Sequence, residues 1–376
     1  MNSDELPSTA NAESSLDLVR IALREPDRVR ELSASSWERL IRQARSAGLL
    51  ARIAAVLEER ALLASVPAGP AAHFVSGRIL ASAQQEEVRR EVTHIADALR
   101  HLSVPLILLK GTAYLLADLP AALGRTFSDV DVLVQKNHLA EVEAALMLAG
   151  WATTHHSEYD QRYYRRWMHE LPPLQHIRRQ TLLDVHHAIL PETARLRPPS
   201  CKLIRAAEPL EGHPGLSVLA PADMVLHSMA HLFHNEEMSS GLRDLSDFDL
   251  LLRHFGARPE FWQGLVERSK ELDLERPLYY GLRQTQAILG TPVPTTALAI
   301  SSRAAPRWPL RGVMDRLWSH ALRSPHRTTR RPMTGMALFA LYVRAHWLRM
   351  PPAQLACHLA VKATTRSLDR AGGSRG

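Results

Sequence analysis

Apolar residues recur at helical spacing over the first hundred positions of the chain. Leucine, isoleucine and alanine repeat every three or four positions among arginine and glutamate, as in WERLIRQARSAGLLARIAAVLEER. This period is typical of amphipathic helices that pack on one side. The first fifteen residues are polar and lack the pattern. We therefore expect a disordered tail over residues 1–15 and a helical N-terminal region over residues 16–100.

After residue 100 the pattern changes to short continuous apolar runs, each bounded by polar or glycine-containing segments. Runs of this length are typical of buried strands rather than helices. They predict three strands, at residues 104–109, 129–134 and 181–189. Helices are expected between them at residues 112–117 and 138–149. The fold class is accordingly predicted to be α+β, with a small mixed-sheet core over residues 101–215.

Prolines punctuate the stretch that follows the third predicted strand, and residues 191–221 are interpreted as linker-like. Helical spacing then returns through LHSMAHLFH and LRDLSDFDLLLRHF. A helical C-terminal region is predicted over residues 216–365, with a disordered tail over residues 366–376. The chain is thus expected to consist of a central core flanked by two helical regions.

Few sequence features point to a membrane or an oxidising compartment. No apolar run approaches the roughly 18 residues that cross a bilayer, so no membrane span is predicted. The two cysteines, Cys201 and Cys357, are far apart, which argues against a disulfide scaffold and against a cysteine-based zinc site. A cytoplasmic protein is expected.

The net charge of +7 is unevenly distributed. Residues 301–376 carry 14 Lys or Arg against 2 Asp or Glu, which leaves residues 1–300 with a net charge of −5. The basic region could contact nucleic acid, a phosphate-rich substrate or anionic lipid, since each offers the same Coulombic attraction. A basic face that contacts only solvent explains it equally well.

Two Asp-x-Asp triplets are candidates for metal binding. Asp129 and Asp131 lie two apart on a predicted strand, so both side chains point to one face, where paired carboxylates can bind Mg²⁺. Asp247 and Asp249 lie in a helical pattern, and residues two apart on a helix do not share a face. We interpret the second pair as structural.

A candidate phosphate-binding turn precedes the first triplet. Lys110, Gly111 and Thr112 stand where a predicted strand ends and a helix begins. Gly111 leaves the backbone open to a phosphate, and the amides at a helix start, a hydroxyl and an ammonium all attract anions. A triphosphate is expected to bind between this turn and the metal. The turn lacks the pattern of a P-loop, which disfavours kinases and ATPases of that class.

A third carboxylate lies in the last predicted strand, in TLLDVHHAI. Asp184 would be costly to bury among apolar neighbours without a cation or hydrogen-bond donors. An Asp that accepts hydrogen bonds from a loop is the alternative. His186 lies on the same strand face and could contact the nucleotide or the acceptor.

Two further groups of residues are candidates for binding sites. His227, His231 and His234 have the spacing of metal ligands on a helix but lack the glutamate of H-E-x-x-H, so packing or capping is the favoured role. The second group consists of interleaved aromatic residues and arginines, namely Tyr159, Arg162, Tyr163, Tyr164, Arg165, Arg166 and Trp167. Its rings could stack on nucleic-acid bases, or the group could form an exposed helix face with long arginine side chains.

The stretch LLKGTAYLLADLPAALGRTFSDVDVLVQKNHLAEVEAALMLAGW resembles the uncharacterised bacterial nucleotidyltransferase family of the DNA polymerase beta-like superfamily. In that family a strand leads to Lys-Gly, an Arg precedes the Asp-x-Asp strand, an Asp-plus-His strand follows, and a helical region with a histidine motif closes the chain. The matching positions here are Lys110-Gly111, Arg125, Asp129-Val130-Asp131, Asp184-Val185-His186 and HSMAHLFH. The resemblance covers residues 100–255.

The resemblance implies an enzyme that moves a nucleoside monophosphate from an NTP, such as ATP, to a hydroxyl or phosphate of a small molecule, peptide or RNA. It implies Mg²⁺ or Mn²⁺ ions held by Asp129 and Asp131, with Asp184 binding the catalytic ion and assisting deprotonation of the acceptor. Lys110 and Arg125 would neutralise phosphate charge, although Arg125 as a plain surface residue is an equal alternative.

The identity of the acceptor leaves other functions open. A toxin-like transferase that acts on RNA is one alternative, and a non-catalytic nucleotide-binding protein with the same fold is another. The wider superfamily usually has Gly-Ser where this chain has Gly111-Thr112, so the mode of phosphate binding is in question.

Overall fold

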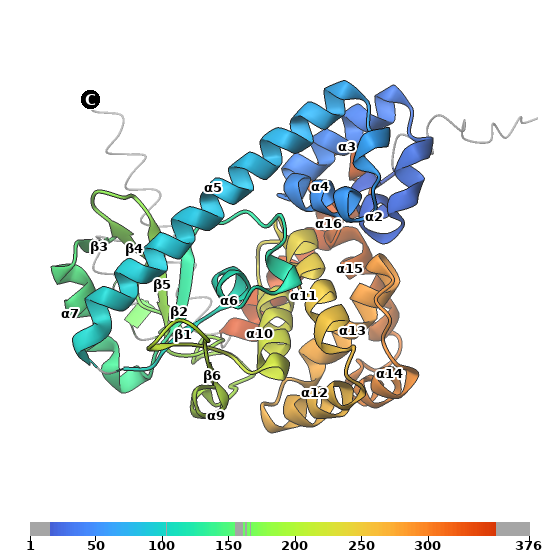
Figure 1. Ribbon diagram of the computed structural model, residues 1–376. Coiled ribbons are helices and arrows are strands. Elements are labelled where there is room, and N and C mark those ends of the chain that lie inside the picture. The colour runs from blue at the N-terminus through green and yellow to red at the C-terminus, as the bar shows by residue number, and fades with distance from the viewer. Residues whose placement is uncertain (1–15, 103, 155–160, 162–163, 166, 351–376) are drawn as a thin grey trace, which may run out of the picture.

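The computed structural model describes residues 16–102, 104–154, 161, 164, 165 and 167–350. A mixed sheet lies on one side of the molecule, and helices from both ends of the chain form the rest (Figure 1). The predicted α+β fold is confirmed. The predicted tails at residues 1–15 and 366–376 lie outside the described residues, and the predicted domain boundaries stay predictions.

The N-terminal residues form helices, as their spacing predicts. The helices are α2 (Leu18–Arg24), α3 (Ala34–Ser46), α4 (Leu50–Glu59) and α5 (Ala68–Leu99), with short 3-10 segments η1 (Pro26–Glu31), η2 (Leu63–Ser65) and η3 (Arg100–Leu102). The side chain of Ser33 accepts a hydrogen bond from the backbone of Ser36 and caps the start of α3. These helices bring apolar faces together at one end of the molecule.

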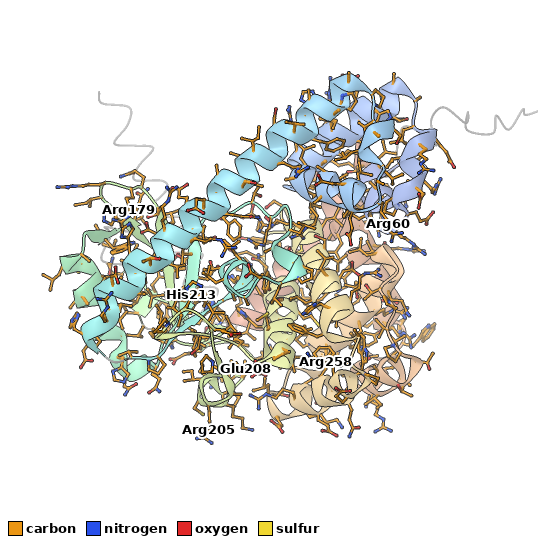
Figure 2. All side chains as sticks on the ribbon, viewed as in Figure 1. Arg60, Arg179, Arg205, Glu208, His213 and Arg258 are labelled. Atoms are coloured by element: carbon orange, nitrogen blue, oxygen red, sulfur yellow. The ribbon has the colours of Figure 1, made fainter. Side chains whose placement is uncertain are left out.

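Helix α5 connects the N-terminal helices to the sheet. Its 32 residues give it a length of about 48 Å, and it runs diagonally across the molecule (Figure 1). Near its C-terminal end, Glu91 accepts a hydrogen bond from Nε of Arg179 at 2.7 Å. The guanidinium of Arg179, a side chain labelled in Figure 2, also lies over the ring of Trp151 in the sheet, 4.9 Å from its centroid. One arginine thus ties the helix to the sheet.

Seven strands form a single sheet in the order β3-β4-β5-β2-β1-β7-β6. The strands are β1 (Leu106–Leu108), β2 (Val130–Leu133), β3 (Trp151–Thr153), β4 (Leu174–His176), β5 (Leu182–His186), β6 (Glu208–Pro209) and β7 (Leu216–Val218). Strand β1 pairs antiparallel with β2 and parallel with β7, while β2 pairs parallel with β5. The three predicted strands are present with narrower bounds.

The interpretation of residues 191–221 as linker-like is wrong. This stretch contains helix α9 (Ser200–Ala206) and strands β6 and β7. Residues 216–218 pair in register with residues 106–108, so the sheet supplies the backbone hydrogen-bond partners that a short strand between prolines cannot supply for itself. The side chains of Leu216 and Val218 are buried.

Most residues after β7 lie in helices, as predicted, up to residue 350, where the described residues end. The helices are α10 (Pro221–His234), α11 (Gly241–Phe255), α12 (Pro259–Glu271), α13 (Glu275–Leu289), α14 (Thr295–Ser301), α15 (Leu310–Ala321) and α16 (Thr334–Arg349). No helix in the described part of the chain is long and apolar enough to cross a membrane.

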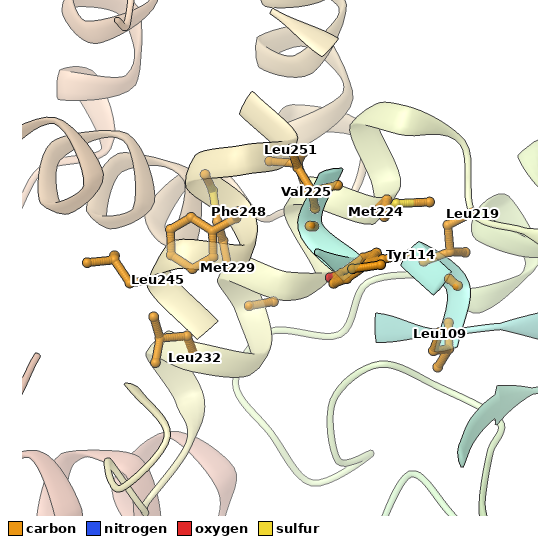
Figure 3. Packing of buried hydrophobic residues seen from close by; sticks show 14 of the residues in the cluster. Leu109, Tyr114, Leu219, Met224, Val225, Met229, Leu232, Leu245, Phe248 and Leu251 are labelled. Carbon is orange, nitrogen blue, oxygen red and sulfur yellow. The ribbon is translucent and has the colours of Figure 1, made fainter. Parts of the chain in front are cut away.

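Of the two helices within the core, the first joins the sheet to the C-terminal helices, and the second packs on α5 and β3. Helix α6 (Lys110–Leu116) follows β1 directly, and α7 (Leu139–Leu148) follows β2. Tyr114 of α6 is buried beside Met224 and Val225 of α10 (Figure 3). Helix α10 also packs against Phe248 of α11 (Figure 3). The hydroxyl of Tyr114 forms a hydrogen bond with Ser228. Through this packing α6 connects α10 to the strand β1, which it follows.

Candidate functional site

The parallel pairing of β2 with β5 brings two aspartates side by side. Asp131 is directly opposite Asp184 in the register of the two strands. Neighbouring strands lie about 4.8 Å apart, and alternate residues share a face. His186 is two residues beyond Asp184 and shares its face, while Val185 points into the core.

Asp129 stands one residue before β2 rather than within it. Its Oδ1 accepts a hydrogen bond from the hydroxyl of Ser128 at 2.9 Å. Asp129, Asp131 and Asp184 all line one cavity of about 350 Å³. The three predicted carboxylates are therefore brought together in a single space.

The cavity has two chemically different walls. Lys110 and His186 join the carboxylates on the sheet side. The other side comes from residues 168–170 and from the C-terminal region. Its charged and imidazole groups include His169, Glu170, His231, His234, Glu236, Arg243, Asp244 and Arg349.

Asp131 is the best-paired of the three carboxylates. Nζ of Lys110 lies 2.7 Å from its Oδ1, and Nε2 of His186 lies 3.0 Å from the same atom. Burial alone would raise the pKa of Asp131, but Lys110 and His186 outweigh it and hold this pKa well below its usual value. Burial would lower the pKa of Lys110, and Asp131 instead raises it. The two groups form a buried ion pair.

Lys110 also carries backbone strain. Its φ of 47° lies in the left-handed region, which a residue with a side chain rarely adopts. Such strain persists only where the surrounding structure enforces it and is often found at functional sites. Here the strained residue begins α6 and places its ammonium against Asp131.

Asp184 has the opposite surroundings. Within the described residues its carboxylate forms no hydrogen bond and no ion pair, although it is partly buried. Burial, followed by the negative charges of Asp131 and Glu170, raises the pKa of Asp184 to about 7. Burial and Asp131 also raise the pKa of Asp129. Three clustered oxygen donors of this kind fit a hard divalent cation.

His186 connects Asp131 with a glutamate that the sequence did not suggest. Its Nδ1 lies 3.2 Å from Oε2 of Glu170. Burial would lower the pKa of His186, but the hydrogen bond to Asp131 and the charge of Glu170 raise it. Glu170 forms an isolated antiparallel bridge with His186. Because Glu170 comes from a segment without apolar periodicity, only the tertiary pairing reveals it.

Gly111 and Thr112 are placed differently from what we expected. Both are buried, and neither is among the residues that line the cavity. A Cβ atom on Gly111 would overlap the guanidinium of Arg125, so the glycine makes room for this arginine rather than for a phosphate. Among the residues that the structure describes, the hydroxyl of Thr112 has no hydrogen-bond partner. Phosphate binding by these two residues stays a prediction.

The interpretation of Arg125 as a plain surface residue is wrong, because it is buried. Its Nε donates to Oδ2 of Asp247 at 2.9 Å, and Nη1 of Arg52 donates to the other oxygen at 2.5 Å. Asp249, on the same helix, instead accepts hydrogen bonds from Arg253 and Thr291. The second Asp-x-Asp triplet thus makes packing contacts in two directions, as the helical spacing predicts. Arg125 also lines the cavity.

The histidines of α10 are buried to different extents. Burial lowers the pKa of His227 to about 3 and that of His234 to about 4. Nδ1 of His234 lies 2.9 Å from the carbonyl oxygen of Ala230, a contact within the helix. His231 and His234 line the cavity, whereas His227 does not. Packing accounts for His227 and His234.

Part of the aromatic and arginine group lies outside the described residues, namely Tyr159, Arg162, Tyr163 and Arg166. Of the others, Tyr164 lines the cavity. Arg165 donates two hydrogen bonds to the carboxylate of Glu143, at 2.8 and 2.6 Å. The stacking role of this group stays a prediction.

The last turn of α16 reaches the cavity from the far end of the chain. The hydroxyl of Thr193 donates to the carbonyl oxygen of Arg349 at 2.7 Å, and the backbone amide of Arg195 donates to that of Leu348 at 2.9 Å. Arg349 lines the cavity and pairs with Glu236, with 3.2 Å between Nη1 and Oε2. No local pattern in the sequence indicates this arginine.

Comparison with known proteins yields one match. A family model described as an uncharacterised nucleotidyltransferase matches residues 33–290, which is more than two thirds of the chain. No curated protein and no solved structure matches the chain. The matched residues include every predicted site residue and exclude α16.

Proposed function

The chain belongs to the uncharacterised nucleotidyltransferase family, and we propose that it transfers a nucleoside monophosphate from an NTP to a hydroxyl or phosphate of an acceptor. The observation that carries this proposal is the parallel register of β2 and β5. It places Asp131 beside Asp184, in one cavity with Asp129. Phosphoryl-type transfer needs clustered carboxylates that hold divalent cations against the substrate's phosphates.

The donor set favours Mg²⁺ or Mn²⁺ as the cofactor. Asp129, Asp131 and Asp184 would hold it, and Asp184 has no competing partner within the described residues. The cation would lower the pKa of the acceptor hydroxyl and offset the charge of the triphosphate. We also assign the chain to the DNA polymerase beta-like superfamily, which the Asp-x-Asp strand next to a third aspartate strand supports.

The chain's own residues have distinct roles in this proposal. Lys110 keeps Asp131 ionised through the 2.7 Å contact between Nζ and Oδ1. Arg125, held in place by Asp247, faces the same cavity and would bind a phosphate oxygen. Asp184 is the carboxylate available to accept a proton from the acceptor. His186 orients Asp131.

A second candidate function is transfer to RNA. It is supported by arginines of the C-terminal region that lie exposed on the surface, namely Arg303, Arg307, Arg311, Arg316, Arg327, Arg330 and Arg331. Asp315, the acidic residue among them, is already paired with Arg283. A binding shift of tRNA that weakens steeply with salt would favour this acceptor over a small molecule.

The test is calorimetric titration of the full chain with ATP, GTP, CTP and UTP in the presence of Mg²⁺. The wild type is compared with an Asp129→Asn, Asp131→Asn double variant. A matched control, Asp97→Asn with Asp118→Asn, removes two carboxylates that are exposed and paired only with arginines. Circular dichroism verifies the fold of each variant.

We expect the wild type and the control variant to bind at least one NTP and the double variant to bind none. Pyrophosphate release in the presence of an acceptor then establishes transfer. Binding without any release across acceptors would support the non-catalytic alternative. Absence of NTP binding by the wild type, or equal binding by the double variant, would overturn the proposal.

A further inference from the structure

A second group of metal-ligand side chains lies beside the aspartates. One donor atom each from His169, Glu170 and His186 lies within 4.8 Å of the others. All three residues line the cavity. We propose that His169, Glu170 and His186 form a binding site for a zinc-type transition-metal ion, separate from the carboxylate site at Asp129, Asp131 and Asp184.

The distances within this group match those between ligands of one ion. Oε2 of Glu170 lies 3.2 Å from Nδ1 of His186 and 3.8 Å from Nε2 of His169. Metal–ligand bonds of about 2.0–2.1 Å in tetrahedral geometry separate neighbouring ligand atoms by about 3.3 Å. The carboxylate oxygen therefore stands between two imidazoles at the spacing that a bound ion requires.

Within the described residues, Nδ1 of His186 is buried and has no hydrogen-bond partner of acceptable geometry, although Oε2 of Glu170 lies 3.2 Å away. A buried polar atom without such a partner is costly, and an ion bound between the nitrogen and the carboxylate would satisfy both. The side chain of His186 is 97% buried, so solvent does not satisfy it.

The opposite nitrogen of His186 has the partner that a metal-binding histidine usually has. Nε2 lies 3.0 Å from Oδ1 of Asp131. Metal ligands of this type commonly donate their second ring N–H to a carboxylate, which fixes the tautomer and the ring orientation. With Nε2–H directed at Asp131, Nδ1 keeps its lone pair for a metal ion and lies 3.2 Å from Oε2 of Glu170.

The backbone holds these ligands on a rigid support. The amide of His187 donates to the carbonyl oxygen of His169 at 2.8 Å, and the amide of Leu171 donates to that of Val185 at 2.9 Å. The segment of residues 169–171 therefore extends the pairing of β5. The rings of His169 and His186 lie with centroids 5.2 Å apart.

The ligand types separate this site from the carboxylate site. Two imidazoles and one carboxylate suit Zn²⁺, Co²⁺ or related ions, whereas Mg²⁺ takes oxygen ligands. The two sites share His186, which contacts Asp131 on one side and Glu170 on the other. An ion at the second site would fix the orientation of His186 and, through it, that of Asp131.

The test measures binding of Zn²⁺ to the metal-stripped full chain by equilibrium dialysis, with excess Mg²⁺ present to occupy the carboxylate site. His169→Ala and Glu170→Gln each remove one ligand. Glu192→Gln is the matched control, because Oε1 of Glu192 lies 3.9 Å from Nδ1 of the neighbouring His187. Replacement of Zn²⁺ by Co²⁺ adds a visible absorption band that reports nitrogen ligands and tetrahedral geometry.

We expect the wild type and Glu192→Gln to bind one Zn²⁺ per chain, and both ligand variants to bind at least about tenfold more weakly. Equal binding by folded His169→Ala and Glu170→Gln would overturn the site. So would absence of Zn²⁺ binding by the wild type at micromolar concentration. The measurement contains no nucleotide, so its outcome is independent of the proposed transfer activity.

Discussion

Two buried charge clusters, one around each Asp-x-Asp triplet, differ in how their charges are balanced. Around Asp247, two arginines, Arg52 and Arg125, contact the two oxygens of one carboxylate. Around Asp131 the ratio is reversed, because three carboxylates, Asp129, Asp131 and Asp184, share one cavity in which Lys110 and His186 both contact the same oxygen of Asp131. The first cluster has a surplus of donors, and the second has a surplus of acceptors.

The difference separates a structural cluster from a binding site. A buried carboxylate whose two oxygens are both paired with arginines has no free oxygen to offer a cation. A buried carboxylate without a partner destabilises the folded state and is retained where a cation or substrate completes it. The raised pKa of Asp184 records this cost, while Asp247, between its arginines, has a lowered pKa despite its burial.

The largest effect is expected from Asp131→Asn. Removal of this carboxylate should lower Mg²⁺-dependent nucleotidyl transfer about a thousandfold, because a metal ion supplies several kcal/mol of charge stabilisation in the transition state. Pyrophosphate release measures the rate. Activity within tenfold of the wild type would show that the acidic cluster around Asp131 is structural, like the one around Asp247.

Arg52→Met should affect folding rather than binding. It leaves Asp247 with one arginine instead of two, and loss of a partner from a buried ion pair costs about 3–5 kcal/mol. Urea denaturation measures the free energy of unfolding. Mg²⁺-dependent NTP binding by the folded variant should stay at the wild-type level. A stable variant that has lost NTP binding would show that the contact between Arg52 and Asp247 contributes to the nucleotide-binding site.

In metal-free protein, Asp184→Asn should stabilise the folded state, whereas removal of a charged side chain from a paired site usually destabilises it. The pKa of Asp184 is about 7 in the folded chain and near 4 when unfolded, so its contribution to stability is full below pH 4 and is lost as pH rises through 7. With EDTA present, the variant should therefore be more stable than the wild type at pH 8, by an amount of the order of 1 kcal/mol or more, and should converge with it near pH 4. Thermal unfolding across this range measures the difference, and parallel pH profiles would contradict the raised pKa.

The smallest effect is expected from Asp249→Asn. Its ion-pair partner, Arg253, has a side chain that is 41% exposed, so water screens the interaction. The asparagine can still accept the hydrogen bond from Thr291. A loss of about 1 kcal/mol in the free energy of unfolding is expected. A loss as large as that for Arg52→Met would show that the two ends of this triplet are equally essential.

Local patterns in the sequence predict the parts of the site that lie on regular elements. The apolar runs around residues 106–108, 130–133 and 182–186 mark strands, and alternation on a strand places Asp184 and His186 on one face. The opposition of Asp131 and Asp184 depends on which strands pair and in which register. No local pattern encodes that choice.

The remaining site residues come from segments with no periodic signal. Glu170 reaches the cavity because it forms an isolated bridge to His186 of β5. Arg349 belongs to α16, which begins more than 140 residues after the end of β5. At Gly111 the sequence suggested room for a phosphate, whereas the structure fills that room with the guanidinium of Arg125. Strand β7 was missed because its pairing partner, β1, lies about 110 residues earlier.

The docking of α16 onto the segment after β5 has a consequence for how the protein is made. Synthesis proceeds from the N-terminus, so the sheet and its aspartates leave the ribosome well before Thr334–Arg349. Until that helix arrives, Thr193 lacks its acceptor and the cavity lacks Arg349. A partly synthesised chain therefore carries the three aspartates in a pocket that is open where Arg349 will lie, and this wall is added only after the last turn of α16 has been made.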